Sequence, residues 1–353
     1  MSIAWQSFLG MKIPGPWSLF FLLVLALLWL SSAPWGRESK PLINGAGASF
    51  PFPLYARWFA TYERLDPTVR FNYQAIGSGG GQQQLLHQTV DFGASDSPVR
   101  QAILKTAPEK ILHIPMVAGA DALAYNLPGS PPLHLGPETI ADIFLGRIDN
   151  WNDSRLAQIN PNIQLPSLPL VVVHRSDGSG TTYIFTDYLA KVSSEWARIA
   201  GRGTAVRWPT GIGAKGNEGV AGQIRSLPGA IGYLELAFAV QNPLPYAAVK
   251  NRAGNYVLPS PESMTQAMAS SPLERDDFRI SIADASGPGA YPIAGLTWLL
   301  LYEKPPDRQK AEKLLAFVRW CLTDGQALAS SLDYAPLPPR LRERVLASLP
   351  EIR

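Results

Sequence analysis

IGSGGGQQQ at residues 76–84 and DFGASD at residues 91–96 are the most informative stretches of this sequence. The first follows residues 69–75, in which apolar and polar side chains alternate as they do along a half-buried β-strand. A helix is expected to follow the glycines, over roughly residues 82–90. A glycine-rich turn between a strand and a helix directs free backbone N–H groups and the positive end of the helix dipole at one point. This turn therefore predicts an anion site.

Asp96, at the end of the second stretch, narrows the choice of anion. It follows a short predicted strand and can approach the same point as the glycine-rich turn. A carboxylate repels a fully ionised oxyanion, but it accepts a hydrogen bond from an oxyanion that still carries a proton. The two stretches together predict a protonated oxyanion, and phosphate is the first candidate.

The composition is that of a globular protein with room for about two domains. The chain has 353 residues, of which 46% are hydrophobic and 17% are charged. The net charge of +3 is small and dispersed, and Lys and Arg form no run, so we do not expect nucleic-acid binding. Cys321 is the single cysteine, which excludes an intramolecular disulfide and a cysteine metal cluster. It lies in a helical pattern typical of a core residue.

The N-terminus carries an export signal. Residues 17–30 (WSLFFLLVLALLWL) are uncharged and apolar, too short for a typical membrane span but suited to a secretory signal peptide. Ser31 and Ala33 form a small-x-small cleavage motif, but Pro34 is unfavourable directly after the cut. We therefore predict that residues 1–42 form either a cleaved signal peptide or an uncleaved signal anchor, followed by a linker. Either alternative exports the rest of the chain.

Strand and helix patterns alternate over the remaining sequence, which predicts an α/β architecture. The continuous β-branched run at residues 170–173 indicates a buried strand. Helices are expected at residues 54–65, after residue 182, and near residues 309–322 and 340–349.

Three segments share one local design, in which small residues and a hydroxyl precede a helix. They are residues 45–50 (GAGASF), 76–81 (IGSGGG) and 175–181 (RSDGSGT). Each offers hydroxyl and backbone donors, and the third adds Arg175, whose guanidinium can bind two oxygens at once. Asp177 is placed to hold Arg175 by a salt bridge. One such turn alone would usually be a simple helix cap, but three of them with an arginine and a carboxylate indicate an oxyanion-binding site.

Signatures of enzymes are missing from the sequence. No glycine-rich turn ends in the Gly-Lys-Ser/Thr of a P-loop, and DGSG at residues 177–180 misses the nucleophile-elbow spacing by one residue. The histidines show no metal-ligand spacing; they are His87, His113, His134 and His174. We therefore predict a binding protein with no catalytic residues, no metal and no cofactor.

From about residue 43 to its C-terminus, the chain closely resembles the phosphate-binding proteins of bacterial phosphate ABC importers. The matching stretches, in collinear order, are GAGASFPFPLYARW from Gly45, NYQAIGSGGGQQQLL from Asn72, TVDFGASDSPV from Thr89, RSDGSGTTYIFTDYLAKV from Arg175, WPTGIGAKGNEGVAGQIRSLPGAIGYLE from Trp208 and LDYAPLP from Leu332. The resemblance implies a two-lobed, type II-like periplasmic-binding-protein fold with two hinge crossovers. It places lobe I at residues 43–115 and 287–353, and lobe II at residues 116–286.

The resemblance also assigns the ligand contacts, position by position. The family's phosphate-binding positions correspond to Ser49, Phe50, Ser78, Asp96, Arg175, Ser179, Gly180 and Thr181, and Asp177 corresponds to the partner of the arginine. Asp96 would accept the phosphate proton and so exclude sulfate. Ser49 departs from the threonine that is frequent in the family, but it retains the hydroxyl.

The function implied by the resemblance is high-affinity phosphate binding and delivery. The expected partners are inorganic phosphate and the membrane permease of the importer with its ATPase, and the expected state is a periplasmic monomer that binds no nucleic acid. An uncleaved N-terminal segment would tether it to the membrane. The alternatives are an exported phosphate sensor and a phosphate-handling enzyme that uses the same cleft.

Overall fold

The computed structural model describes residues 40–349 of the chain. The predicted signal peptide or anchor at residues 1–42 lies outside this range except for its last three residues. Among the described residues, no helix is both long enough and apolar enough to cross a membrane.

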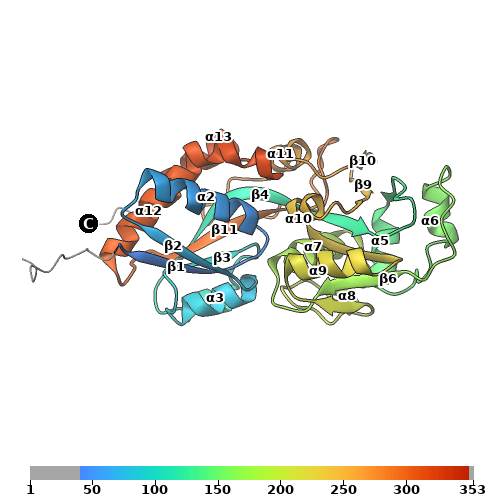
Figure 1. The fold of residues 1–353 in the computed structure, drawn as a ribbon, viewed down its shortest axis with the longest axis horizontal. Coiled ribbons are helices and arrows are strands. Elements are labelled where there is room, and N and C mark those ends of the chain that lie inside the picture. The colour runs from blue at the N-terminus through green and yellow to red at the C-terminus, as the bar shows by residue number, and fades with distance from the viewer. Residues whose placement is uncertain (1–39, 350–353) are drawn as a thin grey trace, which may run out of the picture. The chain divides into compact units, whose positions relative to one another are not determined.

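Strands and helices alternate along the described chain, which confirms the α/β prediction (Figure 1). The strands are β1 (Leu42–Gly47), β2 (Arg70–Ala75), β3 (Phe92–Ser95), β4 (Ile111–Tyr125), β5 (His134–Leu135), β6 (Val171–Arg175), β7 (Ile212–Ala214), β8 (Ala230–Glu235), β9 (Ala248–Lys250), β10 (Tyr256–Val257) and β11 (Ala294–Tyr302). The helices are α2 (Phe52–Leu65), α3 (Ser78–Leu86), α4 (Gln101–Leu104), α5 (Pro137–Phe144), α6 (Ser154–Ile159), α7 (Gly180–Val192), α8 (Ser194–Ile199), α9 (Gly216–Ser226), α10 (Leu236–Gln241), α11 (Pro261–Ala269), α12 (Arg308–Leu322) and α13 (Pro339–Ser348).

Eight of these strands are hydrogen-bonded in the order β2-β1-β3-β11-β4-β8-β6-β7. In the first part of the order, β2-β1-β3-β11-β4, the strand β11 returns from the far end of the sequence to lie between β3 and β4. β1 is parallel to both β2 and β3, and β11 is antiparallel to both of its neighbours. A small separate sheet has the order β10-β9-β5.

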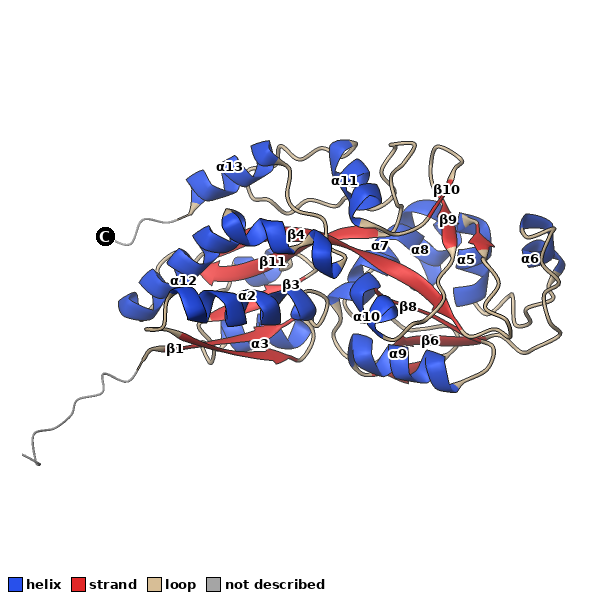
Figure 2. Ribbon diagram, turned by 45° about the horizontal axis from the view of Figure 1, so that its top comes forward, coloured by secondary structure: helices blue, strands red, loops and turns tan. Residues whose placement is uncertain are grey.

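The long strand β4 joins the two lobes (Figure 2). From Ile111 to Ala120 it pairs with β11, and from Asp121 to Tyr125 it pairs with β8. The helices α2, α3 and α12 lie around the sheet on the β11 side of this change, whereas α7, α8 and α9 lie on the β8 side (Figure 1).

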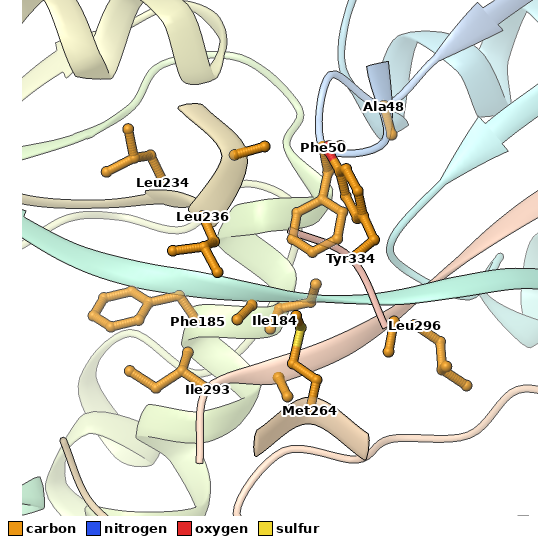
Figure 3. Packing of buried hydrophobic residues seen from close by; sticks show 14 of the residues in the cluster. Ala48, Phe50, Ile184, Phe185, Leu234, Leu236, Met264, Ile293, Leu296 and Tyr334 are labelled. Atoms are coloured by element: carbon orange, nitrogen blue, oxygen red, sulfur yellow. The ribbon is translucent and has the colours of Figure 1, made fainter. Parts of the chain in front are cut away.

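A continuous apolar core fills both lobes, and its largest fully buried side chains include Trp58, Trp151 and Trp196. Near β4, the rings of Phe50 and Tyr334 lie beside each other with centroids 6.5 Å apart (Figure 3). The hydroxyl of Tyr334 donates to the backbone carbonyl of Phe50 at 2.6 Å. This hydrogen bond connects Tyr334, near the C-terminus, to Phe50, the last residue of the first glycine-and-hydroxyl segment.

Most helix boundaries agree with the sequence, but the helix after the glycines begins earlier than predicted. α3 starts at Ser78 and not near residue 82, so Gly79, Gly80 and Gly81 form its first turn. Glycine disfavours helices, which is why the pattern placed the start later. Here close packing outweighs propensity, since a Cβ on Gly81 would lie 2.4 Å from the Cα of Gly47. As expected, Cys321 is buried in α12.

Candidate functional site

The strand register brings the predicted site residues to one edge of the sheet. Gly47 at the end of β1 pairs with Ala75 at the end of β2 and with Ala94 in β3. The segments that follow these strands therefore emerge side by side, which is where ligands bind in open α/β sheets. In the other lobe, Arg175 at the end of β6 pairs with Ala214 at the end of β7.

Ser49 and Phe50 form the first part of the site, in the turn between β1 and α2. Both residues are buried. Their backbone N–H groups have no acceptor in the described part of the chain, although nearly all buried N–H groups in proteins do. The turn thus presents unpaired donors at the positions that the sequence identified.

Ser78 begins α3 and forms the second part. Gly77 before it has φ of 88°, a conformation open to glycine but strained for other residues. The N–H of Gly77 donates to the carbonyl of Gly47, which fixes the start of the helix. The N–H of Ser78 is left without an acceptor among residues 40–349, and it lies at the positive end of the helix dipole.

Asp96 lies beside Ser78 and is fully buried. Its backbone N–H donates to the Ser78 hydroxyl at 3.1 Å, and that hydroxyl lies 3.4 Å from Asp96 Oδ2. The other carboxyl oxygen, Oδ1, has no hydrogen-bond partner in the described residues. Burial raises the pKa of Asp96 to about 7, even though the positive charge of Arg175 acts to lower it. This carboxyl group is therefore poised to exchange a proton near neutral pH.

Arg175 and Asp177 form the predicted ion pair across the site. The Arg175 Nε and Nη2 atoms lie 2.7 Å and 2.5 Å from the two Asp177 oxygens, and Nη1 donates to Thr181 Oγ1 at 3.1 Å. Although burial acts to raise it, hydrogen bonds and charge from Arg175 hold the pKa of Asp177 below its ordinary value. A guanidinium has five N–H donors, so two remain for a ligand after these contacts.

The start of α7 completes the donor set. The Ser179 hydroxyl accepts a hydrogen bond from the N–H of Thr182, as a typical N-cap does. The N–H groups of Gly180 and Thr181 have no acceptor among the described residues. All three residues are buried at the N-terminus of a 13-residue helix, where the dipole favours an anion.

The two lobes touch at this place. The N–H of Gly79 donates to the carbonyl of Gly178 at 2.8 Å. A Cβ on Gly180 would lie 2.3 Å from both Asp96 Oδ2 and Ser78 Oγ. The structure therefore brings together every residue that the sequence nominated, from both sides of the site.

Two further polar residues belong to the site and were not nominated from the sequence. Asn217, the second residue of α9, donates from Nδ2 to Ser49 Oγ at 3.1 Å and to Thr181 Oγ1 at 3.2 Å. The Tyr233 hydroxyl accepts from the N–H of Arg175 and bonds to the Thr182 hydroxyl. Asn217 lies in the stretch from Trp208 that resembles the phosphate-binding proteins, and that resemblance was the signal that could have revealed it.

Within residues 40–349, no three His, Cys, Asp or Glu side chains are grouped so that they could hold a metal ion. The site is instead a set of backbone, hydroxyl and guanidinium donors with one carboxylate of raised pKa. That combination can bind an oxyanion, and it contains no paired nucleophile and base.

Comparison with known proteins identifies the family and the fold. Residues 32–324 match the family model of the PBP superfamily domain. The phosphate-binding protein PstS of Pasteurella multocida is 42% identical over 308 residues, which cover 86% of this chain and 89% of the relative. Two solved structures share the fold. A high-affinity periplasmic phosphate-binding protein bound with phosphate has a TM-score of 0.69 at 23% identity, and the phosphate-binding protein of Stenotrophomonas maltophilia has 0.66 at 20% identity. Each comparison covers 87% of this chain and 94% of the other.

Proposed function

This chain belongs to the PBP superfamily and, within it, to the family of the PstS phosphate-binding proteins, and from this membership we propose that it binds inorganic phosphate and delivers it to a phosphate ABC transporter. One observation supports the proposal most strongly. A buried site brings unpaired backbone donors and an arginine together with the carboxyl group of Asp96, whose Oδ1 has no hydrogen-bond partner in the described residues. The relatives are binding proteins, and we accordingly propose neither catalysis nor a cofactor.

The donors match a compact tetrahedral oxyanion in number and type. The backbone N–H groups are those of Phe50, Ser78, Gly180 and Thr181, and the hydroxyls are those of Ser49, Ser179 and Thr181, since the Ser78 hydroxyl donates to Asp96. The two remaining N–H groups of Arg175 supply charge and a planar fork that fits two oxygens. Most of the proposed hydrogen bonds to the ligand therefore come from uncharged N–H and O–H groups, and the charge-assisted ones come from Arg175.

Asp96 would supply the selectivity. Monobasic and dibasic phosphate each carry a proton that can be donated to the carboxylate, whereas sulfate at neutral pH carries none. Sulfate would place a charged acceptor against the Asp96 carboxylate, whose Oδ1 has no hydrogen-bond partner in the described residues. An unsatisfied buried polar group costs roughly 1–3 kcal/mol, and a charged one more. Repulsion of the wrong ligand therefore sets the preference.

We further propose the lobe division predicted from the sequence, with lobe I at residues 43–115 and 287–353 and lobe II at 116–286. The change of strand partner between Ala120 and Asp121 supports a crossing inside β4, although it lies five residues after the proposed boundary. The second crossing would precede β11. Two crossings of this kind allow the lobes to close around a ligand as a hinge.

For location and partners, we propose a periplasmic protein that acts as a monomer and meets the permease subunits of an importer driven by an ATPase. Whether the N-terminal segment is cleaved or tethers the protein is decided by N-terminal sequencing of the exported form. Dependence of phosphate uptake on this chain in cells separates transport from a purely sensory role.

The binding function is tested by titration calorimetry of the exported domain with phosphate and with sulfate. At pH 9, about two units above the pKa of Asp96, we expect phosphate to bind at least about a hundredfold more tightly than sulfate, which corresponds to about 2.8 kcal/mol. Comparable affinities would contradict the assignment. Incubation with a generic phosphomonoester serves as the enzymatic control, and sustained release of phosphate would favour the alternative of a phosphate-handling enzyme.

Gly180→Ala is expected to weaken phosphate binding by about a hundredfold. The added methyl group would overlap Asp96 Oδ2 and Ser78 Oγ, so the two sides of the site could no longer approach each other. Gly222→Ala is the matched control, because a Cβ on Gly222, in α9 of the same lobe, meets no atom within 4 Å. Calorimetry that gives equal affinities for both variants would show that this contact is not needed for binding.

A further inference from the structure

Asn217 connects hydroxyl groups from both sides of the site and is itself completely buried. Its Nδ2 atom lies 3.1 Å from the Oγ of Ser49, in the turn after β1, and 3.2 Å from the Oγ1 of Thr181, in α7. Its Oδ1 atom accepts a hydrogen bond from the backbone N–H of Glu235 at 3.2 Å. One amide group therefore holds two of the proposed ligand hydroxyls.

The orientation of this amide follows from its neighbours. A backbone N–H can only donate, so the atom that faces the Glu235 N–H must be the amide oxygen. The NH₂ group must then face Ser49 and Thr181 and offer one proton to each. The reversed amide would set two donors against each other at Glu235.

This orientation dictates where the hydroxyl protons point. Thr181 Oγ1 accepts from Asn217 and also from Arg175 Nη1, which occupies both of its lone pairs. Its O–H can then only donate, and it has no acceptor among residues 40–349. The Ser49 hydroxyl likewise accepts from Asn217 and donates to no described group. Two buried O–H donors are thus left for an acceptor that residues 40–349 do not supply.

We propose that Asn217 is a positioning residue for phosphate, which it serves by forcing the hydroxyls of Ser49 and Thr181 to act as donors. The proposal rests on the proposed function, because the missing acceptor is taken to be phosphate. It also makes Asn217 a hydrogen-bonded link between the lobes, since Ser49 lies on one side of the site and Asn217 and Thr181 lie on the other. Asn217 itself needs no contact with the ligand.

Two substitutions of Asn217 test the proposal by calorimetry with inorganic phosphate. Asn217→Ala frees both hydroxyls to rotate, and we expect affinity to fall about 10- to 100-fold. Asn217→Asp still accepts from the Glu235 N–H, but its second oxygen draws both hydroxyl protons away from the site and adds a negative charge. We expect the Asn217→Asp variant to bind phosphate more weakly than Asn217→Ala. If the alanine variant does not fold, the comparison of Asn217→Asp with the wild type is sufficient to test the proposal.

A comparison of Asn217→Ala in the presence and absence of the two hydroxyls distinguishes a positioning role of Asn217 from a general effect on protein stability. With both hydroxyls removed (Ser49→Ala with Thr181→Val), Asn217→Ala should change phosphate affinity by less than about twofold, because nothing remains to be oriented. An undiminished loss in that background would overturn the proposal.

Asn126→Ala is the matched control for the loss of amide hydrogen bonds. Asn126 Nδ2 donates to the carbonyls of Ile224 and Arg225 at the other end of α9. This variant should lower the melting temperature but leave phosphate affinity unchanged. If the wild-type protein binds phosphate and both Asn217 variants match it, only the role of Asn217 is overturned. If the wild-type protein does not bind phosphate, the proposed function fails and the proposal fails with it.

Discussion

Asp96→Asn is expected to bring sulfate affinity to within about tenfold of phosphate affinity. In the wild-type site, the buried Asp96 carboxylate would repel an unprotonated sulfate oxygen, and its Oδ1 has no hydrogen-bond partner in the described residues. An asparagine amide can accept from Ser78 with its oxygen and donate to the ligand with its nitrogen, so the repulsion becomes a hydrogen bond. Phosphate also keeps acceptor oxygens for that amide and loses little. Titration of each variant with both anions gives the ratio directly.

The pH dependence of sulfate binding offers a second test of Asp96. Burial raises its pKa to about 7, so the group is protonated below that pH and can then donate to sulfate. Sulfate affinity of the wild-type protein should be nearly constant below about pH 7. Above it, affinity should fall about tenfold per pH unit, because only the protonated fraction binds. The Asp96→Asn variant should lose this dependence.

Asp91→Asn provides the control for removing a carboxylate from the same segment. Asp91 accepts from the N–H of Asn44 and pairs with Lys310 at 3.1 Å, away from the site. It should leave the phosphate-to-sulfate ratio unchanged. A wild-type ratio that persists in Asp96→Asn would remove Asp96 from the selectivity role.

The fold could be predicted from local patterns only in part. Alternating and continuous apolar runs located β2 and β6, and helical spacing located α2 and α12, because these signals depend on neighbours in sequence. The double role of β4 has no such signal, since its 15 residues pair with β11 on one half and β8 on the other. The resemblance to a known family supplied the two-lobed arrangement that periodicity could not. Long-range pairing, and not local propensity, decides these features.

The candidate site was more predictable than the fold, for a physical reason. Glycines, hydroxyls, Arg175 and Asp96 occur in short segments whose backbone geometry is set locally, so their chemistry is readable in sequence. Asn217 was missed because its contact with Ser49 spans 168 positions, and an asparagine after a glycine has no distinctive local role. Residues that orient ligand contacts are harder to find than the contacts themselves, since their partners come from elsewhere in the chain.

Arg175→Ala is expected to weaken phosphate binding by at least about a thousandfold. The substitution removes two charge-assisted donors from a site in which the arginine side chain is only 1% exposed. The substitution also leaves the Asp177 carboxylate without its arginine partner. Because the Asp177 side chain is only 13% exposed, its charge would then repel the anion. Arg175→Lys keeps the charge but cannot hold both Asp177 oxygens and Thr181, so an intermediate loss is expected. Calorimetry with phosphate measures each step.

The double variant Arg175→Ala with Asp177→Ala distinguishes the lost attraction from the added repulsion. If the stranded carboxylate contributes, this variant should bind phosphate more tightly than Arg175→Ala alone. Arg202→Ala is the matched control, since Arg202 also pairs with a buried carboxylate, that of Asp187, at 2.6 Å. Its affinity should stay near that of the wild type. Phosphate binding by Arg175→Ala within tenfold of the wild type would show that the ligand does not contact this side of the site.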